Sequence, residues 1–194
     1  MTADTSEENS CKDQFGDCES VWLFGNGSLI YKVDFPYLER KPASIQNWVR
    51  RFWQGSHDHR GTEDNPGCVV TLISKPGSVC GGVAYCVEPS VFRQLDIREK
   101  NGYLRFPTQM TFRDESHVDG LVYIATSEND AFLGEASEYE IAKHIAAAEG
   151  QSGPNCEYLF ELAIALRELG EFDEHVFEIE RCLNEIGGLG NNTL

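Results

Sequence analysis

The segment VWLFGNGSLIYK, residues 21–32, is where the reading of the fold begins. Its first half is a short apolar run that ends at Gly25, which predicts a buried strand closed by a turn-forming residue. The loop that follows, GNGSL, has a second glycine at position 27. Glycine permits positive φ and a close approach to the backbone, so successive N–H groups there could point at an anion or a carbonyl oxygen. A plain tight turn and a binding loop both fit this composition.

The glycine loop does not match the common nucleotide-binding patterns. A dinucleotide fingerprint that starts at Gly25 needs a third glycine at position 30, where Ile30 stands. A phosphate-binding P-loop needs a glycine directly before its lysine and a Ser or Thr after it, and Lys32 has neither. We therefore expect no nucleotide at this loop.

The charge of the chain limits its partners. The 194 residues carry a formal net charge of −16, which argues against a nucleic-acid surface or an anionic membrane surface. No apolar run approaches the roughly 18 residues that a membrane span needs. The acidic start of the chain does not resemble a signal peptide. We expect no nucleic-acid partner and no membrane partner.

The cysteines and the chain ends complete the organisation. Seven cysteines at irregular spacing include no CxxC pair, so a zinc ribbon is not supported and we expect reduced thiols in the cytoplasm. Residues 1–19 are rich in Ser, Asp, Glu and Lys and are predicted to form a disordered acidic leader. Residues 188–194 are predicted to be a frayed tail. The length of the remainder, residues 20–187, fits a single domain.

The order of the predicted elements favours an α+β fold. Strands are expected within residues 20–25, 44–56, 67–74, 80–88, 102–114 and 117–127, with a turn at KPGSV that would make the third and fourth a hairpin. Pro107 suggests an edge or a bulge in its strand. Three helices follow: the first begins with a capping box of Ser137 and Glu140, the second is N-capped by Asn155 and stopped by Gly170, and the third has an apolar docking face. Strands first and helices last do not form alternating βαβ units.

A glutamate occupies an unexpected place in the segment EPSVFRQLDIREKNGY. This segment is predicted to be a helix, and at about 100° per residue Glu99 falls on the apolar face that Val91 and Leu95 define. Such a carboxylate is solvated, paired with an arginine, or desolvated. Desolvation raises the pKa of a glutamate and makes it a better general base near neutral pH. The residues alone leave two possibilities open: a general base, or a helix-end glutamate that turns out to solvent or makes a structural ion pair.

Other polar residues carry weaker signals. Arg50 and Arg51 alternate on a strand, so one of them points inward and needs an anion. His57 and His59 could bind a metal, but no third and fourth ligands follow at a useful spacing, and a structural loop is favoured. Tyr158 lies among apolar positions in the first turn of its helix, where core packing is the default.

Several segments in one order resemble the blocks of the ChaC family, the glutathione-specific γ-glutamylcyclotransferases. They are VWLFGNGSLIYKVDFPY, RRFWQGSHDHRG, LDIREKNGY, LVYIATSENDAFLG and GPNCEYLFELA, and the resemblance runs from about residue 20 to residue 186. It implies a small mixed β-barrel flanked by helices, which is compatible with the α+β class, and a single γ-glutamylcyclotransferase-like domain over residues 20–187.

The resemblance also implies a reaction. Glutathione would be cleaved to 5-oxoproline and cysteinylglycine without a metal or another cofactor, by attack of the γ-glutamyl α-amine on its own side-chain carbonyl. One carboxylate can take the proton from the amine and return it to the leaving amine. In the family this is the glutamate of the REK block, here Glu99.

The resemblance further assigns substrate contacts. The family's glycine loop grips the γ-glutamyl moiety through backbone N–H groups, which implies contacts from Gly25, Asn26, Gly27, Ser28 and Leu29. A side chain at either glycine would then occupy the space of the substrate. Tyr158 matches a position expected to contact the substrate. Arg51 is expected near a substrate carboxylate only because it lies in one of the matching blocks, and not because it matches a residue of known role.

The sequence departs from the family pattern at two positions. Asn26 stands where tyrosine is usual, and Tyr31 where tryptophan is usual. If the backbone does the gripping, Asn26 is tolerated, since asparagine accepts positive φ better than most residues; if the missing ring matters, affinity or substrate choice differs. The alternatives are the same cyclotransfer on another γ-glutamyl peptide or amine, and a non-catalytic γ-glutamyl-binding or regulatory protein. We expect a monomer.

Overall fold

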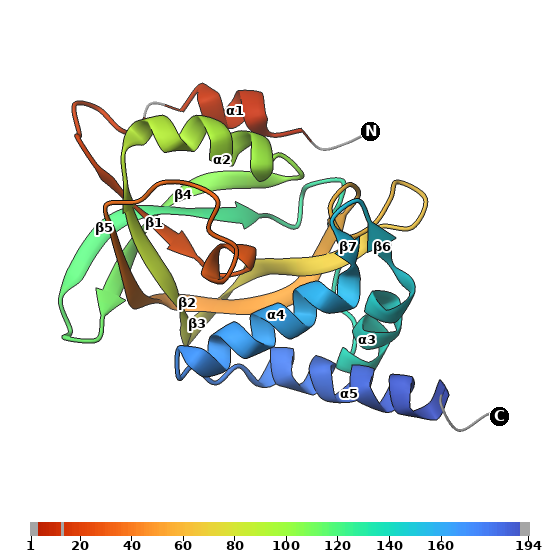
Figure 1. Cartoon of the computed structure of the whole chain (residues 1–194). Coiled ribbons are helices and arrows are strands. Elements are labelled where there is room, and N and C mark those ends of the chain that lie inside the picture. Colours follow the sequence, from red (N-terminus) through yellow and green to blue (C-terminus); the bar gives the residue numbers. More distant parts are fainter. Residues whose placement is uncertain (1–3, 13, 191–194) are drawn as a thin grey trace.

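Five strands close into a barrel in the computed structural model of the chain, which describes residues 4–12 and 14–190 (Figure 1). They are β1 (Val21–Gly25), β2 (Glu39–Ser56), β3 (Gly67–Val87), β4 (Tyr103–Phe112) and β5 (His117–Ala125). Around the barrel the order is β1-β3-β2-β4-β5, and the parallel pairing of β1 with β5 closes it, whereas the other neighbours are antiparallel. The expected small mixed β-barrel of an α+β fold is therefore confirmed.

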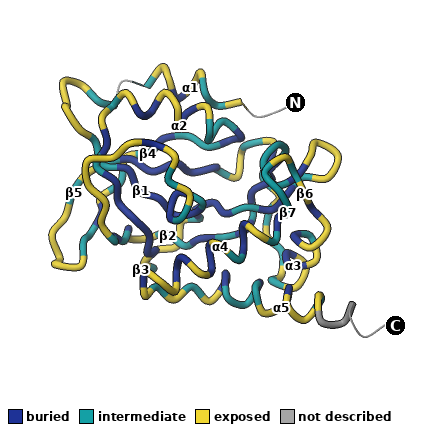
Figure 2. The backbone as a smooth tube through the Cα atoms, viewed as in Figure 1, coloured by how far each residue is buried: buried dark blue, intermediate teal, exposed yellow. Residues whose placement is uncertain are grey.

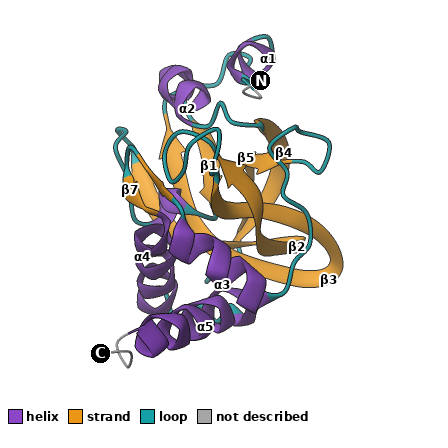
Figure 3. Cartoon of the chain, turned by 90° about the vertical axis from the view of Figure 1, so that its right-hand side faces the viewer, coloured by secondary structure: helices purple, strands orange, loops and turns teal. Residues whose placement is uncertain are grey.

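Helices cover two regions of the barrel. On one side α3 (Glu138–Ala147), α4 (Asn155–Glu168) and α5 (Glu174–Gly190) pack together, and the short ribbon of β6 (Glu149–Gly150) and β7 (Gly153–Pro154) joins α3 to α4 (Figure 3). At another end lie α1 (Ser6–Ser10), the 3₁₀ turn η2 (Pro89–Val91) and α2 (Phe92–Arg98). A further 3₁₀ turn, η1 (Ser28–Ile30), follows β1 directly. None of the helices within the described ranges is both long enough and apolar enough to cross a membrane.

The core explains why β1 is a continuous apolar run. Its successive residues Leu23 and Phe24 are both fully buried but belong to different apolar clusters. Side chains alternate between the two faces of a strand, so β1 is buried on both faces at these two residues. The tube in Figure 2 carries the buried colour along this part of the strand. The cluster around Phe24 draws on all five barrel strands, and the cluster around Leu23 continues into α2, α4 and α5.

The helix boundaries follow their local signals. Ser137 Oγ accepts a hydrogen bond from the Glu140 N–H, and the Glu140 carboxylate accepts one from the Ser137 N–H at 3.1 Å, so the predicted capping box is confirmed. Gly170, with φ of +71°, follows the end of α4 as expected. The apolar face of α5 is buried at Val176 and Ile179 and packs on α3 and α4.

The predicted hairpin at KPGSV does not form. Both halves belong to the single strand β3 and pair in line with β2, with a register shift between Gln46 and Trp48. Residues 75–78 form a bulge there, and the Gly77 N–H donates to the side chain of Asn47, at 2.9 Å. Pairing with the long strand β2 thus replaces pairing between the two halves. Pro107 lies in the part of β4 that pairs with β5 only, as the edge interpretation requires.

Asn155 does not cap α4. Pro154 occupies the N-cap position, and the Asn155 side chain instead accepts from the Cys68 N–H at 2.6 Å and donates to the Cys68 carbonyl at 3.0 Å. The side-chain amide therefore pairs with the backbone at the start of β3 as a neighbouring strand would. It fixes α4 to the barrel, a tertiary role that the local capping rule does not consider.

The acidic leader is ordered where it is described, contrary to the prediction for residues 1–19. The helix α1 buries Asn9, whose Nδ2 donates to the Tyr103 carbonyl at 2.9 Å and whose Oδ1 accepts from the Arg105 N–H at 2.9 Å. The Thr5 N–H donates to the Lys100 carbonyl at 2.8 Å. These side-chain amides and backbone groups hold the leader against the start of β4 although its composition is polar. Residues 1–3 and 13 lie outside the described residues, as do residues 191–194 of the predicted tail, while α5 continues to Gly190.

Candidate active site

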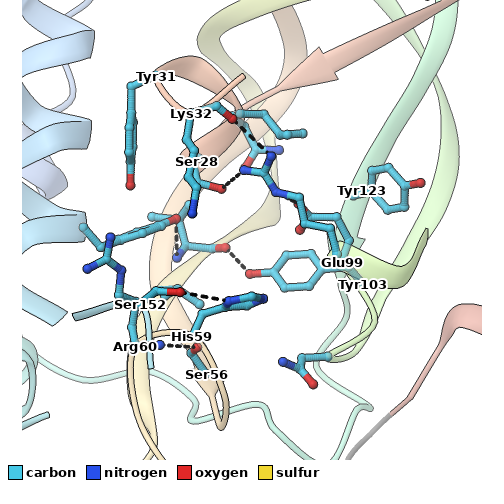
Figure 4. Close-up of a pocket in the computed structure, with 18 of the residues that line it drawn as sticks. Ser28, Tyr31, Lys32, Ser56, His59, Arg60, Glu99, Tyr103, Tyr123 and Ser152 are labelled. Atoms are coloured by element: carbon cyan, nitrogen blue, oxygen red, sulfur yellow. Dashed lines mark hydrogen bonds and ion pairs between the residues drawn. The ribbon is translucent and has the colours of Figure 1, made fainter. Parts of the chain in front are cut away.

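A cavity of about 150 Å³ opens where the loop after β1 faces the end of α2 and the first turn of α4 (Figure 4). It collects most of the residues that the sequence analysis singled out: Asn26, Gly27, Ser28, Leu29, Glu99 and Tyr158. Gly25 lies one residue before this wall, as the last residue of β1, and does not line the cavity. Arg51 does not line it either.

The two loop glycines are required by the protein's own packing. A Cβ atom at Gly27 would lie 2.7 Å from Val70 Cγ2 and 2.8 Å from the Tyr158 hydroxyl. A Cβ atom at Gly25 would lie 2.9 Å from Leu29 Cβ. Contacts with protein atoms therefore disfavour a side chain at either glycine, whether or not it would also enter the space of the substrate. Neither glycine has a positive φ, and neither has Asn26.

Arg50 holds the glycine loop from behind. It is almost fully buried, and its Nε donates to the Asn26 carbonyl at 2.5 Å. Its Nη2 donates to the Gly81 carbonyl, and its Nη1 pairs with the Asp173 carboxylate, each at 2.6 Å. The inward arginine predicted from strand alternation is therefore Arg50, and its anion is Asp173 in the connection between α4 and α5. One side chain thus ties the loop, the barrel and the helical layer together.

Arg51 points elsewhere, which corrects its proposed place near a substrate carboxylate. Side chains alternate along β2, so Arg51 leaves the face that Arg50 occupies. Its Nη1 donates to the Arg50 carbonyl, and it lines a separate cavity with Glu138 and His175.

Glu99 stands at the point where α2 ends. It occupies the C-cap position, and its N–H still donates to the Leu95 carbonyl at 2.8 Å. The apolar face of the helix is buried as predicted, and the Glu99 side chain, 15% exposed, reaches the cavity wall. Burial raises the pKa of Glu99, and the nearby Arg98 opposes that rise without cancelling it. The carboxyl group is therefore poised to exchange a proton closer to neutral pH than an exposed glutamate.

Arg98 connects Glu99 with the glycine loop. Its Nε lies 3.4 Å from Glu99 Oε1, and its Nη2 donates to Ser28 Oγ at 3.0 Å. Nη1 donates to the Lys32 carbonyl and pairs with the Asp34 carboxylate. Arg98, the residue before Glu99, is thus its ion-pair partner, and it fixes the loop relative to the carboxylate.

Tyrosines form much of the remaining wall. The Tyr158 hydroxyl accepts from the Val70 N–H at 3.4 Å, and the Tyr103 hydroxyl donates to the Val70 carbonyl at 2.6 Å. Burial raises the pKa of both phenols, so they stay neutral donors and acceptors. The sequence analysis considered Tyr158 but missed Tyr103. Its position just after Glu99, at the start of a strand, was the available signal.

The end of β2 and its connection to β3 supply Ser56, His59 and Arg60 to the cavity, and the β6–β7 ribbon supplies Ser152. Of these, the sequence singled out only His59, as a metal-ligand candidate. His59 Nδ1 lies 3.2 Å from Ser152 Oγ, and the Arg60 N–H donates to Ser56 Oγ at 3.1 Å. Within residues 4–12 and 14–190, no three His, Cys, Asp or Glu side chains gather as metal ligands. The connection serves as a wall of the cavity, a role that its polar composition alone did not distinguish from a plain loop.

Comparisons with known proteins agree over most of the chain. Residues 21–186 match the family model described as ChaC-like protein. The γ-glutamylcyclotransferase 2-3 of Arabidopsis thaliana is 41% identical over 179 residues, covering 86% of this chain and 90% of the relative. The glutathione-specific γ-glutamylcyclotransferase 1 of Danio rerio is 42% identical over 174 residues, covering 84% and 89%. The crystal structure of a yeast γ-glutamylcyclotransferase specific to glutathione superposes with a TM-score of 0.81 at 31% identity, covering 86% of this chain and 96% of that one.

Proposed function

The chain belongs to the ChaC family, and on this basis we propose that it is an enzyme that cleaves glutathione to 5-oxoproline and cysteinylglycine. In this reaction the α-amine nitrogen of the γ-glutamyl residue bonds to its own γ-carbonyl carbon. The bond from that carbon to the cysteine nitrogen breaks, and one proton moves from the attacking amine to the leaving amine. The observation that supports the proposal most is a buried, protonatable carboxylate, Glu99, facing a glycine loop across a cavity.

Glu99 is proposed as the general base and acid. A free α-amine is largely protonated near neutral pH, so its proton has to be removed before attack. A carboxylate with a raised pKa accepts that proton and then returns it to the cysteine nitrogen as the bond breaks. Because the attack is intramolecular, the protein's other task is to hold the folded conformer, an effect worth about 7 kcal/mol in favourable cases.

The loop after β1 is proposed to bind the γ-glutamyl group. Ser28 and Leu29 open the 3₁₀ turn η1, and the first N–H groups of a helical turn have no acceptor within it. Donors of this kind, aimed at the γ-carbonyl oxygen, stabilise the negative charge that develops there during attack. Since the gripping groups are backbone atoms, Asn26 is compatible with this role, and its carbonyl already holds the loop to Arg50.

The test is release of 5-oxoproline by the purified protein, with glutathione, γ-glutamyl-alanine and γ-glutamyl-lysine as parallel substrates, with and without a chelator. We expect release from glutathione that the chelator does not change. Release from another γ-glutamyl compound alone would identify a different substrate. The absence of release from all three would favour a non-catalytic γ-glutamyl-binding or regulatory protein.

The role of Glu99 is tested separately with Glu99→Gln. This variant is expected to retain glutathione binding and to lose turnover by about 10²- to 10⁴-fold, the range of general acid–base catalysis. Glu128→Gln, at an exposed glutamate in the loop after β5, is the matched control and should keep wild-type turnover. Full activity of Glu99→Gln would remove the glutamate from the mechanism.

The organisation of the protein completes the proposal. We propose that residues 20–187 form a single domain, because one buried apolar cluster reaches from β1 to α5. We further propose a cytoplasmic monomer; gel filtration with light scattering tests the monomer, and a fluorescent fusion tests the location.

A further inference from the structure

The cations of the cavity differ in how fully they are paired. Lys32, Arg60 and Arg98 line it. Arg98 is bound to two carboxylates, Asp34 and Glu99, and to Ser28. A ligand carboxylate would therefore compete with existing partners at Arg98. Lys32 is exposed at the rim, whereas the Arg60 side chain is only 12% exposed.

Arg60 keeps part of its guanidinium free. Its Nη1 donates to the Pro154 carbonyl and to the Glu157 carboxylate, each at 3.0 Å. Its Nε and Nη2 take no part in these two contacts, and the guanidinium also acts on the Tyr31 side chain. Glu157 is 57% exposed, so solvent screens that ion pair. The result is an arginine fixed at one edge by Nη1, with its other donors at the cavity.

A second side chain at the same place lacks a partner. The Tyr31 hydroxyl is buried and meets no hydrogen-bond partner at normal geometry within the described part of the chain, although the Arg60 guanidinium is close enough to act on it. Its ring packs edge-on against Tyr158, with ring centroids 6.3 Å apart. Burial raises the pKa of Tyr31, and Arg60 is the strongest influence that opposes the rise, so the two side chains act on each other. A buried hydroxyl without a partner is costly unless a ligand supplies one.

The positions of these groups identify the ligand end that they fit. In Figure 4, Tyr31 and Arg60 lie on one side of the cavity and Glu99 on the other. If Glu99 takes the proton of the α-amine, the γ-glutamyl end of the substrate lies at Glu99. An extended three-residue peptide spans about 10 Å, so its C-terminal carboxylate lies far from the amine.

We propose that Arg60 and Tyr31 form a subsite for the C-terminal carboxylate of glutathione. The guanidinium supplies a charge and N–H donors, and the Tyr31 hydroxyl donates one further hydrogen bond. The subsite rests on the proposed function, because the orientation of the substrate is inferred from the proposed role of Glu99. It selects substrates by the charge at their far end, and it gives Tyr31, which departs from the family pattern, a part in that selection.

The test compares glutathione with its C-terminal amide, which keeps the reacting groups and lacks the negative charge. For the wild type we expect kcat/KM to be about 10- to 100-fold higher with glutathione, the range of one hydrogen-bonded charge pair. Arg60→Gln should lower kcat/KM for glutathione by a similar factor, mainly through KM, and should change the amide far less. Tyr31→Phe should lower kcat/KM for glutathione several-fold while leaving the melting temperature unchanged or higher, because the lost hydroxyl is buried without a hydrogen bond of normal geometry.

Two further variants separate a binding role from a structural one. Glu157→Gln removes the exposed partner of Arg60 but keeps the arginine, and the preference for glutathione over the amide should persist. Lys32→Met removes the competing cation, and the preference should again persist. Equal losses with both substrates in Arg60→Gln, or loss of the preference in Lys32→Met, would overturn the subsite. A wild type that turns over neither substrate contradicts the proposed function instead, so the two failures are distinguishable.

Discussion

Arg98 Nε lies 3.4 Å from Glu99 Oε1, so the residue that precedes Glu99 in the chain is also its ion-pair partner. The pairing is available because α2 ends between them, with Arg98 as its last residue and Glu99 at the C-cap. Two effects of opposite sign therefore act on one carboxyl group: burial raises the pKa of Glu99, and the guanidinium lowers it.

Replacing Arg98 by Met should move the pH dependence of the reaction. Without the positive charge, the pKa of Glu99 rises further, and the unprotonated base is available only at higher pH. The acidic limb of kcat/KM, which reports the free enzyme, should therefore shift to higher pH. Arg93→Met, at an exposed arginine of the same helix, is the control and should leave the limb in place. A limb that stays fixed in Arg98→Met would show that another group titrates there.

Glu99→Gln should stabilise the protein at neutral pH. The folded-state pKa of Glu99 is raised above its usual value of 4.5, so its favourable contribution is complete below that value and is lost as the pH rises through the folded pKa. Each unit of such a shift corresponds to about 1.4 kcal/mol. The melting temperature of the variant should exceed that of the wild type by a margin that grows from about pH 5 to about pH 8. A margin that shrinks over this range would mean that the folded protein favours the charged carboxylate.

Gly27→Ala should destabilise the fold and lower activity. The added Cβ would lie under 3 Å from both Val70 and the Tyr158 hydroxyl, and overpacking of this kind costs about 1–3 kcal/mol. Adding Tyr158→Phe removes one of the two clashing atoms, so part of the stability should return in the double variant. Gly187→Ala, at a helical glycine with no atom near a new Cβ, should be neutral or stabilising. Urea denaturation of the four proteins is the measurement, and an unchanged midpoint for Gly27→Ala would show that the loop yields easily.

Arg50 and Arg51 offer a matched pair of variants. Arg50→Met leaves the Asp173 carboxylate and the carbonyls of Asn26 and Gly81 without their donor, and breaking a buried pair costs about 3–5 kcal/mol. The freed loop should also raise KM for glutathione. Arg51→Met should change both quantities little, because that side chain lies outside the cavity. Denaturation and steady-state kinetics measure both effects, and a larger KM effect at Arg51 would restore its predicted place beside the substrate.

Asn9→Ala tests whether the leader matters to the site. Its amide holds the Tyr103 carbonyl and the Arg105 N–H, and a buried group left unpaired costs about 1–3 kcal/mol. Stability should fall by that amount, and kcat should fall with it because Tyr103 lines the cavity. The exposed Ser10→Ala is the control. Equal behaviour of the two variants would show that the leader is a passive attachment.

Much of the local structure could be predicted from the sequence, because its signals act within a few residues. The strand ending at Gly25, the capping box at Ser137 and the apolar face beside Glu99 are of this kind. The closed barrel could be expected only from the resemblance to a family, since strand order depends on pairings between distant segments.

The predictions that were wrong share a physical cause. In each case, a partner that is distant in the sequence outcompetes the local partner on which the prediction relied. Asn155 finds the backbone of Cys68 in place of its own helix, and the halves of β3 find β2 in place of each other. The leader is polar enough in composition to remain disordered, yet the Asn9 side chain binds the backbone of β4 at Tyr103 and so fixes the leader to the barrel. None of these partners is near in sequence, so local residue propensities and motif spacings could not predict them.

The parallel closure of β1 by β5 has a consequence for how the chain folds. Trp22 pairs with Gly120, so the first barrel strand to leave the ribosome has to wait for the last. The loop-closure entropy of a long segment has to be overcome before that pairing returns any stability, and such topologies fold slowly. Until then the apolar residues of β1, which are buried on both faces in the finished barrel, have no partner strand on one side. The earliest strand of the barrel is therefore the segment most exposed to misassociation during synthesis.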